Sequence, residues 1–268
     1  MFIFKSLQMA KQEIPIIVRP FRSFRDKLGP LINNHLANLD SQKSDYDKKV
    51  LELCHIGKFL VLLNENYSIT EVREKPDFII SDTYNSVGVE HEILVRDNYK
   101  KQEGSIKQLF KQAERAFTIK YPGKNLLINI FIKKGFPIFK KNQTNLLVEN
   151  INILIADYLD YGILPENELV DDIFAMPHHQ LNFEPNEGAW GQATLTEDLL
   201  KNAIEKKEKL LKTYIDNSGT KDQWLVIVIG SMGKSSLQMN NNINSVKESG
   251  FARIYLLEDF NGEIVRLK

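Results

Sequence analysis

The chain has 268 residues, with 35 Lys plus Arg balanced by 35 Asp plus Glu, and 43% of its residues are hydrophobic. A formal charge of zero excludes a protein that binds nucleic acid through bulk positive charge, so any such contact requires a local basic patch. The one cysteine, Cys54, excludes an intramolecular disulfide and a four-thiolate zinc site.

The same features predict a cytoplasmic protein without a membrane span. A single cysteine fits a reducing compartment better than a secreted scaffold. Residues 1–7 lack the apolar core of a signal peptide, and no apolar run approaches the roughly 18 residues that a membrane helix needs.

Residues 1–40 are predicted to form a basic N-terminal extension. Its cations are Lys5, Lys11, Arg19, Arg22, Arg25 and Lys27, and its prolines are Pro15, Pro20 and Pro30. The prolines predict that no long helix forms. We favour a lead-in segment that packs on the domain. The alternative is a nucleic-acid-binding arm, because Phe21 and Phe24 alternate with arginines.

Residues 41–268 are predicted to form one α/β domain with an insertion at about 135–195. A Ser44–Asp47 capping box opens a helix that ends near Leu63. The following elements are expected to be a hairpin of strands 77–81 and 87–94, a helix over 105–120 and a strand over 126–132.

The insertion is predicted to be helical, with a helix over 141–161 and an irregular segment over 165–191. After it we expect a long helix over 196–215, a strand over 224–229, and a last hairpin of strands 253–258 and 263–267. The dipeptide Asn261–Gly262 is a strong turn signal for that hairpin.

Three acids in the first hairpin are the main candidates for chemistry. Side chains alternate along a strand, so Glu90 and Glu92 share one face, and strand pairing brings Asp77 beside them. The flanking residues are apolar on both faces, which predicts buried acids that need a metal or another partner. Clustered carboxylates suit a hard divalent cation, and such cations promote phosphodiester hydrolysis. The alternative is an edge hairpin with an acidic outer face.

The order of elements and the segments Pro76–Ile80 and Val87–Glu92 resemble the PD-(D/E)XK nuclease superfamily, the restriction-endonuclease-like fold. The resemblance covers residues 44–133 and resumes over 196–258. It implies an α/β fold with a central mixed β-sheet flanked by helices. It also implies magnesium-dependent cleavage of DNA, less often of RNA.

The resemblance assigns Asp77 and Glu90 as ligands of Mg²⁺ or Mn²⁺, and Glu52 as the acid on the preceding helix. Glu65 and Glu71 are less fitting substitutes for Glu52. Glu92 stands where the family usually has its lysine. Some members with glutamate there remain active, whereas others lose both the lysine and the activity.

A displaced lysine is available on the helix expected over 196–215. Its apolar stripe consists of Leu200, Ala203, Ile204, Leu211 and Tyr214. Lys207 falls at the centre of this stripe. Such a lysine most often extends to the surface along its aliphatic stem. Otherwise it reaches the acids and stabilises the attacked phosphate.

Three further signals are set aside. The turn over 230–235 lacks Walker spacing, because Val228 stands where the first glycine is needed. His178 and His179 are expected to be loop residues first and proton carriers second, because adjacent histidines rarely bind one ion. His91 lies opposite the two glutamates and is expected to pack in the core.

The sequence therefore predicts a metal-dependent nuclease that acts on nucleic acid, with DNA as the expected substrate. Asp77, Glu90 and the helix acid Glu52 hold one or two cations, Glu92 orients or deprotonates water, and Lys207 stabilises charge. The alternative is an inactive nuclease-fold protein that binds nucleic acid or a protein partner. A third hypothesis is an interaction protein with a purely structural acidic hairpin. A homodimer would suit cleavage of both strands, but no residue identifies a dimer face.

Overall fold

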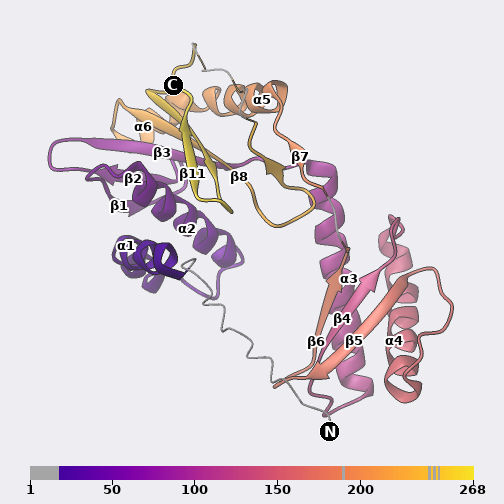
Figure 1. The fold of residues 1–268 in the computed structure, drawn as a ribbon. Helices are drawn as coiled ribbons and strands as arrows, with labels where there is room; N and C mark the ends of the chain where they lie inside the picture. Colours follow the sequence, from indigo (N-terminus) through magenta and orange to yellow (C-terminus); the bar gives the residue numbers. More distant parts are fainter. Residues whose placement is uncertain (1–17, 189–190, 241–242, 244–245, 247) are drawn as a thin grey trace, which may run out of the picture. The chain divides into compact units, whose positions relative to one another are not determined.

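The computed structural model describes residues 18–188, 191–240, 243, 246 and 248–268, with side chains from residue 24 onward. The described residues form two compact units (Figure 1). The first unit comprises the described residues of 1–92, 203–228 and 244–268, and the second comprises those of 93–202 and 229–243. This division differs from the one domain with an insertion at 135–195, because residues 93–134 share a core with the insertion.

The first unit contains a six-stranded sheet in the order β1-β2-β3-β8-β10-β11. Its strands are β1 (Ser68–Val72), β2 (Phe78–Ser81), β3 (Ser86–Ile93), β8 (Gln223–Ile229), β10 (Arg253–Glu258) and β11 (Glu263–Arg266). The two predicted hairpins are confirmed, since β2 pairs antiparallel with β3 and β10 pairs antiparallel with β11. The edge strand β1 was not predicted.

Strand directions in this sheet are mixed, as expected. The N–H of Gly88 donates to the carbonyl of Asp222, and that of Ala252 donates to the carbonyl of Gln223. The first residues of β3, β8 and β10 therefore lie side by side, and these three strands run parallel. The strands β1, β2 and β11 are antiparallel to their neighbours.

Helices cover both faces of this sheet (Figure 1). On one face lie α1 (Val18–Ala37) and α2 (Tyr46–Leu63), and on the other lie α6 (Leu211–Ser218) and the end of α5 (Glu197–Glu208). Buried Ile56 and Phe59 of α2 pack with Val89 and Trp224 of the sheet. The expected α/β class is confirmed.

The helix α1 contradicts the expectation that the prolines prevent a long helix, although Lys5, Lys11 and Pro15 lie outside the described residues. A proline in the first turn removes no intrahelical bond, and Pro30 removes one. Packing compensates, because buried Ile32 and half-buried Leu28 lie against α2. The described part of the predicted extension therefore packs against α2 of the first unit.

The second unit contains a three-stranded sheet in the order β5-β4-β6, with β4 antiparallel to β5 and parallel to β6. Its elements are α3 (Asp97–Lys120), β4 (Leu126–Ile132), the 3-10 helix η1 (Lys141–Gln143), α4 (Thr144–Tyr161), β5 (Val170–Pro177), β6 (Asn182–Asn186), and the short pair β7 (Ala193–Thr194) and β9 (Leu237–Gln238). Phe110 and Phe117 of α3 form its core with Ile130 of β4 and Ile155 of α4.

Three local expectations were wrong. The segment 165–191 contains β5 and β6, so the insertion is not simply helical. The capping box is absent, because α2 begins at Tyr46 after Asp45 and has no side-chain cap. The helix expected over 196–215 is interrupted, because the N–H of Leu210 bonds to the carbonyl of Lys207 in a tighter turn.

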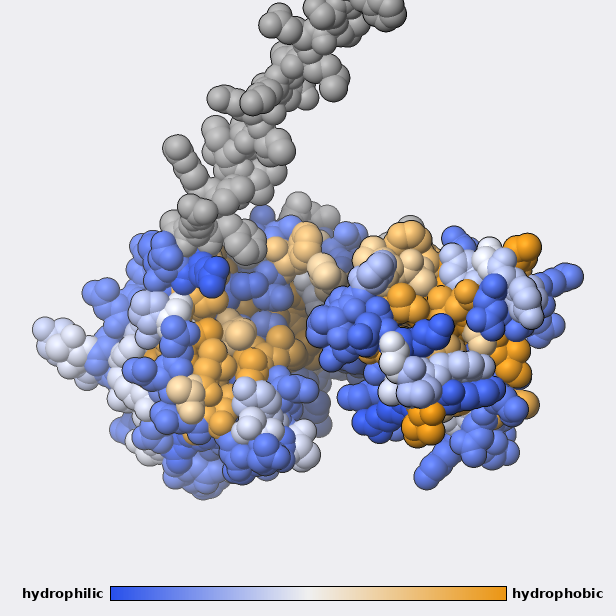
Figure 2. Space-filling view, turned by 90° about the horizontal axis from the view of Figure 1, so that it is seen from below, coloured by the Kyte–Doolittle hydropathy of each residue, from blue (hydrophilic) through white to orange (hydrophobic). Residues whose placement is uncertain are grey.

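Most of the face seen in Figure 2 is hydrophilic, with hydrophobic patches on both units. Within the described residues, no helix combines the length and apolar character needed to cross a membrane.

Candidate functional site

The predicted acids meet on one face of the β2–β3 hairpin in the first unit. Phe78 pairs with Val89, so continuing the register by one residue places Asp77 beside Glu90. The N–H of His91 donates a 2.9 Å hydrogen bond to Oδ2 of Asp77. Asp77 and Glu90 are both buried, as the apolar flanks predicted.

Alternation along β3 separates the acids from the histidine, as predicted. On one face, Nζ of Lys207 lies 2.7 Å from Oε1 of Glu90 and 2.8 Å from Oε2 of Glu92. On the other face, Nδ1 of His55 lies 3.0 Å from Nε2 of His91. The two glutamates therefore share a face, and His91 is a buried core histidine.

Lys207 reaches the acids rather than the surface. Its side chain is only 12% exposed, because α5 directs it toward β3 along the apolar stripe. Burial opposes its charge, but Glu90 and then Glu92 outweigh burial and raise the pKa of Lys207. The ammonium is therefore charged at neutral pH.

Glu92 is held between two lysines. Its Oε1 accepts a 3.1 Å hydrogen bond from the exposed Lys206, in addition to the contact with Lys207. Burial works against the carboxylate, yet the bonds from the lysines lower the pKa of Glu92 overall. Glu92 is consequently a carboxylate, and therefore a potential proton acceptor, at neutral pH.

Asp77 has the opposite electrostatic environment. Burial and then the charge of Glu90 raise the pKa of Asp77 to about 7, against the hydrogen bond from His91. Oε2 of Glu90 and the hydroxyl of Tyr214 are buried near each other, without a hydrogen bond of ordinary geometry. Burial and then Glu90 raise the pKa of Tyr214 as well. Asp77 is therefore partly protonated at neutral pH beside the buried carboxyl of Glu90.

A second lysine, Lys49 of α2, was not singled out from the sequence. Its ammonium lies 3.1 Å from Oε2 of Glu52, 3.3 Å from Glu74 and 3.9 Å from Asp77. The predicted helix acid Glu52 is buried, and Lys49 links it to Asp77. The sequence signal is the i,i+3 spacing of Lys49 and Glu52, which is common in ordinary helices.

The substitutes considered for Glu52 lie elsewhere. Glu65 pairs with Arg253 at 3.1 Å, and Glu71 pairs with Arg73 at 3.6 Å. Both pairs are partly exposed to solvent, where ion pairs contribute little. Glu52 is therefore the helix acid that the structure brings toward Asp77.

A polar network lies on the face of β3 opposite Glu90 and Glu92. Nε2 of His55 is 3.9 Å from Asp259, whose other oxygen is 2.5 Å from Nζ of Lys58. Burial lowers the pKa of His55 despite Asp259, and burial and then His55 hold the pKa of His91 well below its usual range. Both imidazoles are thus neutral at neutral pH. This network was not predicted, because it joins α2, β3 and the turn after β10.

Two carboxylates of this site, those of Asp77 and Glu90, are suited to bind a divalent cation. Asp77 and Glu90 are adjacent, and one oxygen of Glu90 is unpartnered. In the described part of the chain, however, no three His, Cys, Asp or Glu side chains are grouped to hold a metal ion. A third ligand would have to be an oxygen of another kind, such as the carbonyl of His91 on the strand between the glutamates.

The histidine pair His178–His179 and the turn over 230–235 lie in the second unit. Nδ1 of His178 is 2.9 Å from the carbonyl of Gln180, and the ring of His178 lies against that of His179. In the turn over 230–235, the backbone N–H and hydroxyl of Ser235 both donate to Glu103. A carboxylate of this chain therefore takes those donors instead of a nucleotide phosphate.

Searches of protein-family models, curated proteins and solved structures found no match to this chain.

Proposed function

We propose that the first unit is a metal-dependent nuclease of the restriction-endonuclease-like type that hydrolyses phosphodiester bonds of nucleic acid, with DNA as the expected substrate. The observation that carries the proposal is the ammonium of Lys207, 2.7 Å from Glu90 and 2.8 Å from Glu92. In the nuclease superfamily that the sequence resembles, a lysine usually stands at the position that Glu92 occupies here. Lys207 of α5 would supply that missing positive charge. Asp77, Glu90 and this ammonium lie together, although they come from distant parts of the sequence.

In this proposal Asp77 and Glu90 hold Mg²⁺ or Mn²⁺. The unpartnered oxygen of Glu90 and the raised pKa of Asp77 support it, because a cation would relieve the repulsion between the two carboxylates. A bound cation would polarise the phosphoryl group and lower the pKa of the attacking water. Lys49 holds Glu52 beside Asp77 and fixes that side of the site.

The remaining residues move protons and stabilise charge. Glu92 is ionised and half-buried, so it orients the attacking water and accepts its proton. Lys207 stabilises the charge that develops on the phosphoryl oxygens, and it exchanges part of its contact with the glutamates for that charge.

The test is a cleavage assay on double-stranded DNA, single-stranded DNA and RNA, with Mg²⁺ or Mn²⁺ against EDTA. Wild type is compared with Asp77→Ala, Glu90→Ala and Lys207→Ala. Glu71→Gln is the matched control, because Glu71 is an exposed acid on the neighbouring strand β1. We expect metal-dependent cleavage that the first three substitutions abolish and the control retains.

One observation favours a second candidate. This candidate is a catalytically inactive protein of the nuclease fold that binds nucleic acid or a protein partner. Lys207 already neutralises part of the charge of Glu90 and Glu92, which reduces the attraction for a cation. Absence of cleavage on all three substrates, or cleavage that survives Asp77→Ala and Glu90→Ala, would overturn the nuclease proposal. Retained binding without turnover would support the second candidate.

A further inference from the structure

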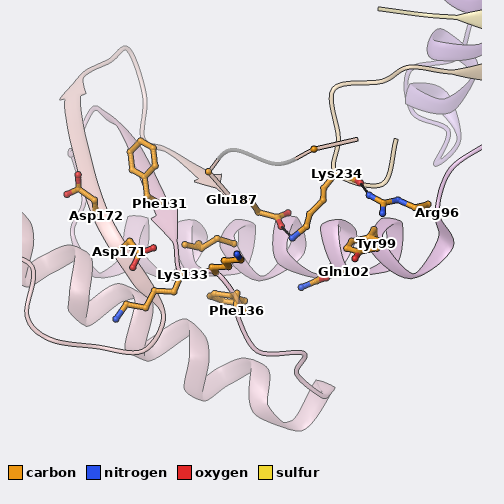
Figure 3. Close-up of a pocket in the computed structure, with 15 residues that line it drawn as sticks. Arg96, Tyr99, Gln102, Phe131, Lys133, Phe136, Asp171, Asp172, Glu187 and Lys234 are labelled. Carbon is orange, nitrogen blue, oxygen red and sulfur yellow. Dashed lines mark hydrogen bonds and ion pairs between the residues drawn. The ribbon is translucent and has the colours of Figure 1, made fainter. Parts of the chain in front are cut away.

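The second unit contains a separate pocket of about 720 Å³. Its walls come from the start of α3, the ends of β4 and β6, the bulge of β5 and the turn over 230–235 (Figure 3). This volume lies within the range of pockets that enclose a small organic ligand. No residue of the proposed nuclease site lines it.

One end of the pocket is basic. The guanidinium of Arg96 lies 4.1 Å from the centre of the Tyr99 ring, and the ammonium of Lys234 lies 5.6 Å from the same centre. Arg96 also donates to the backbone carbonyl of Lys234, which fixes the guanidinium against the turn over 230–235. Both cations therefore lie at the same end of the pocket, where the side chain of Lys234 extends toward Glu187 (Figure 3).

These cations are incompletely compensated. Nε of Arg96 is buried without a hydrogen-bond partner. Lys234 pairs with Glu187 at 3.3 Å, and within the described residues no ion pair to a carboxylate is recorded for Arg96. A phosphate group offers several acceptor oxygens and would accept from the N–H groups of Arg96 at the pocket wall while competing with Glu187 for Lys234.

The opposite end of the pocket has a different character. Asp171 and Asp172 are exposed at the bulge of β5, and the half-buried Phe131 lies on β4 beside them (Figure 3). Carboxylates of this kind accept hydrogen bonds from sugar hydroxyls, and an aromatic ring offers a surface for a base. The pocket therefore offers cations at one end, and carboxylates with an aromatic ring at the other.

We propose that this pocket binds a nucleotide, with its phosphate between Arg96 and Lys234 and its sugar hydroxyls toward Asp171 and Asp172. The turn over 230–235 contributes the side chain of Lys234 and not a backbone cradle, since Ser235 donates to Glu103. The proposal does not depend on the nuclease proposal, because every residue in it belongs to the second unit.

The test is calorimetric titration of the full chain with adenosine 5′-monophosphate, adenosine and inorganic phosphate. We expect saturable binding of the nucleotide, weakened about tenfold or more by Lys234→Ala through loss of a charge-assisted hydrogen bond. Lys124→Ala removes an exposed charge of the same unit outside the pocket and should leave binding unchanged. The double variant Asp171→Asn, Asp172→Asn should weaken the nucleotide and spare inorganic phosphate.

The variant Glu187→Gln distinguishes a change in nucleotide binding from misfolding of the pocket. It frees Lys234 from its ion pair, so nucleotide binding should tighten by about threefold, whereas misfolding would weaken it. A 5′-phosphorylated oligonucleotide tests whether the ligand is a free nucleotide or the end of a nucleic-acid strand. If the oligonucleotide binds more tightly than the mononucleotide, the ligand is the end of a strand, and if it binds more weakly, the ligand is a free nucleotide. The absence of saturable nucleotide binding, or equal binding by wild type and Lys234→Ala, would overturn the proposal.

Discussion

The backbone N–H of His91 donates its hydrogen bond to Oδ2 of Asp77, which ties the acid at the start of β2 to the strand that carries Glu90. This bond favours the ionised form of Asp77. Burial and the carboxylate of Glu90 act more strongly, and the pKa of Asp77 rises to about 7. Asp77 therefore changes its charge near neutral pH.

This pKa predicts how the free energy of unfolding depends on pH. An unfolded aspartate has a pKa of about 3.9, so between roughly pH 4 and pH 7 the folded chain binds more protons than the unfolded chain. The contribution of Asp77 to stability is thus greatest below this window and falls as pH rises through it. We expect Asp77→Asn to remove this fall and to exceed wild type in stability at pH 8 by on the order of 3 kcal/mol.

Urea unfolding at pH 5 and pH 8 measures this effect. Asp216→Asn is the control, because Asp216 is an exposed carboxylate that pairs with Lys212 on α6. It should follow the pH dependence of wild type. Parallel pH dependence for wild type and Asp77→Asn would contradict the raised pKa.

The contact of Lys207 with the glutamates predicts unequal effects of two neighbouring lysines. Lys207→Met leaves Glu90 buried without its cation and should lower the free energy of unfolding by about 3 kcal/mol. Lys206→Met breaks only an exposed contact with Glu92, where the side chain of Lys206 is 70% exposed, and should cost about 1 kcal/mol or less. Chemical unfolding of both variants near neutral pH measures the difference, and equal losses would refute the buried ion pair.

The first hairpin could be predicted because its signals are local. Apolar residues on both faces, the alternation of Glu90 and Glu92, and the turn between the strands all lie within about twenty residues. The ion pair of Lys207 with Glu90 depends on a helix more than a hundred residues later. The helical wheel gave the direction of Lys207 on its own helix, but the sequence left open whether the ammonium reached the acids.

Other features depended on packing that no local pattern encodes. The rule that proline breaks helices failed for α1, because Leu28 and Ile32 bury the helix against α2. The segment 165–191 was expected to be irregular, yet β6 pairs in parallel with β4 across a long connection. Such non-local pairing has no sequence signal of its own, and Pro185 is tolerated because β6 is an edge strand.

The proposed cation site predicts stabilisation by metal at pH 8. A ligand that binds only the folded state adds about 2.7 kcal/mol at a hundredfold excess over its dissociation constant. We expect Mn²⁺ to raise the unfolding temperature of wild type at constant ionic strength, and to leave that of Asp77→Asn and Glu90→Gln unchanged. An equal rise in all three proteins would place the bound cation elsewhere.

The contact between α1 and α2 can be tested at Gly57. A Cβ atom there would lie 2.5 Å from Cγ2 of Ile32 and 2.7 Å from Cδ1 of Leu28, so these side chains, or α1 itself, must shift to accommodate it. Gly57→Ala should therefore destabilise the first unit by about 1–3 kcal/mol, although alanine favours a helix. Gly104 lies in α3 with open space around its Cβ position, so Gly104→Ala should stabilise the protein by about 0.5–1 kcal/mol. Thermal unfolding of both variants should give shifts of opposite sign, and stabilisation by both would mean that α1 does not pack closely on Gly57.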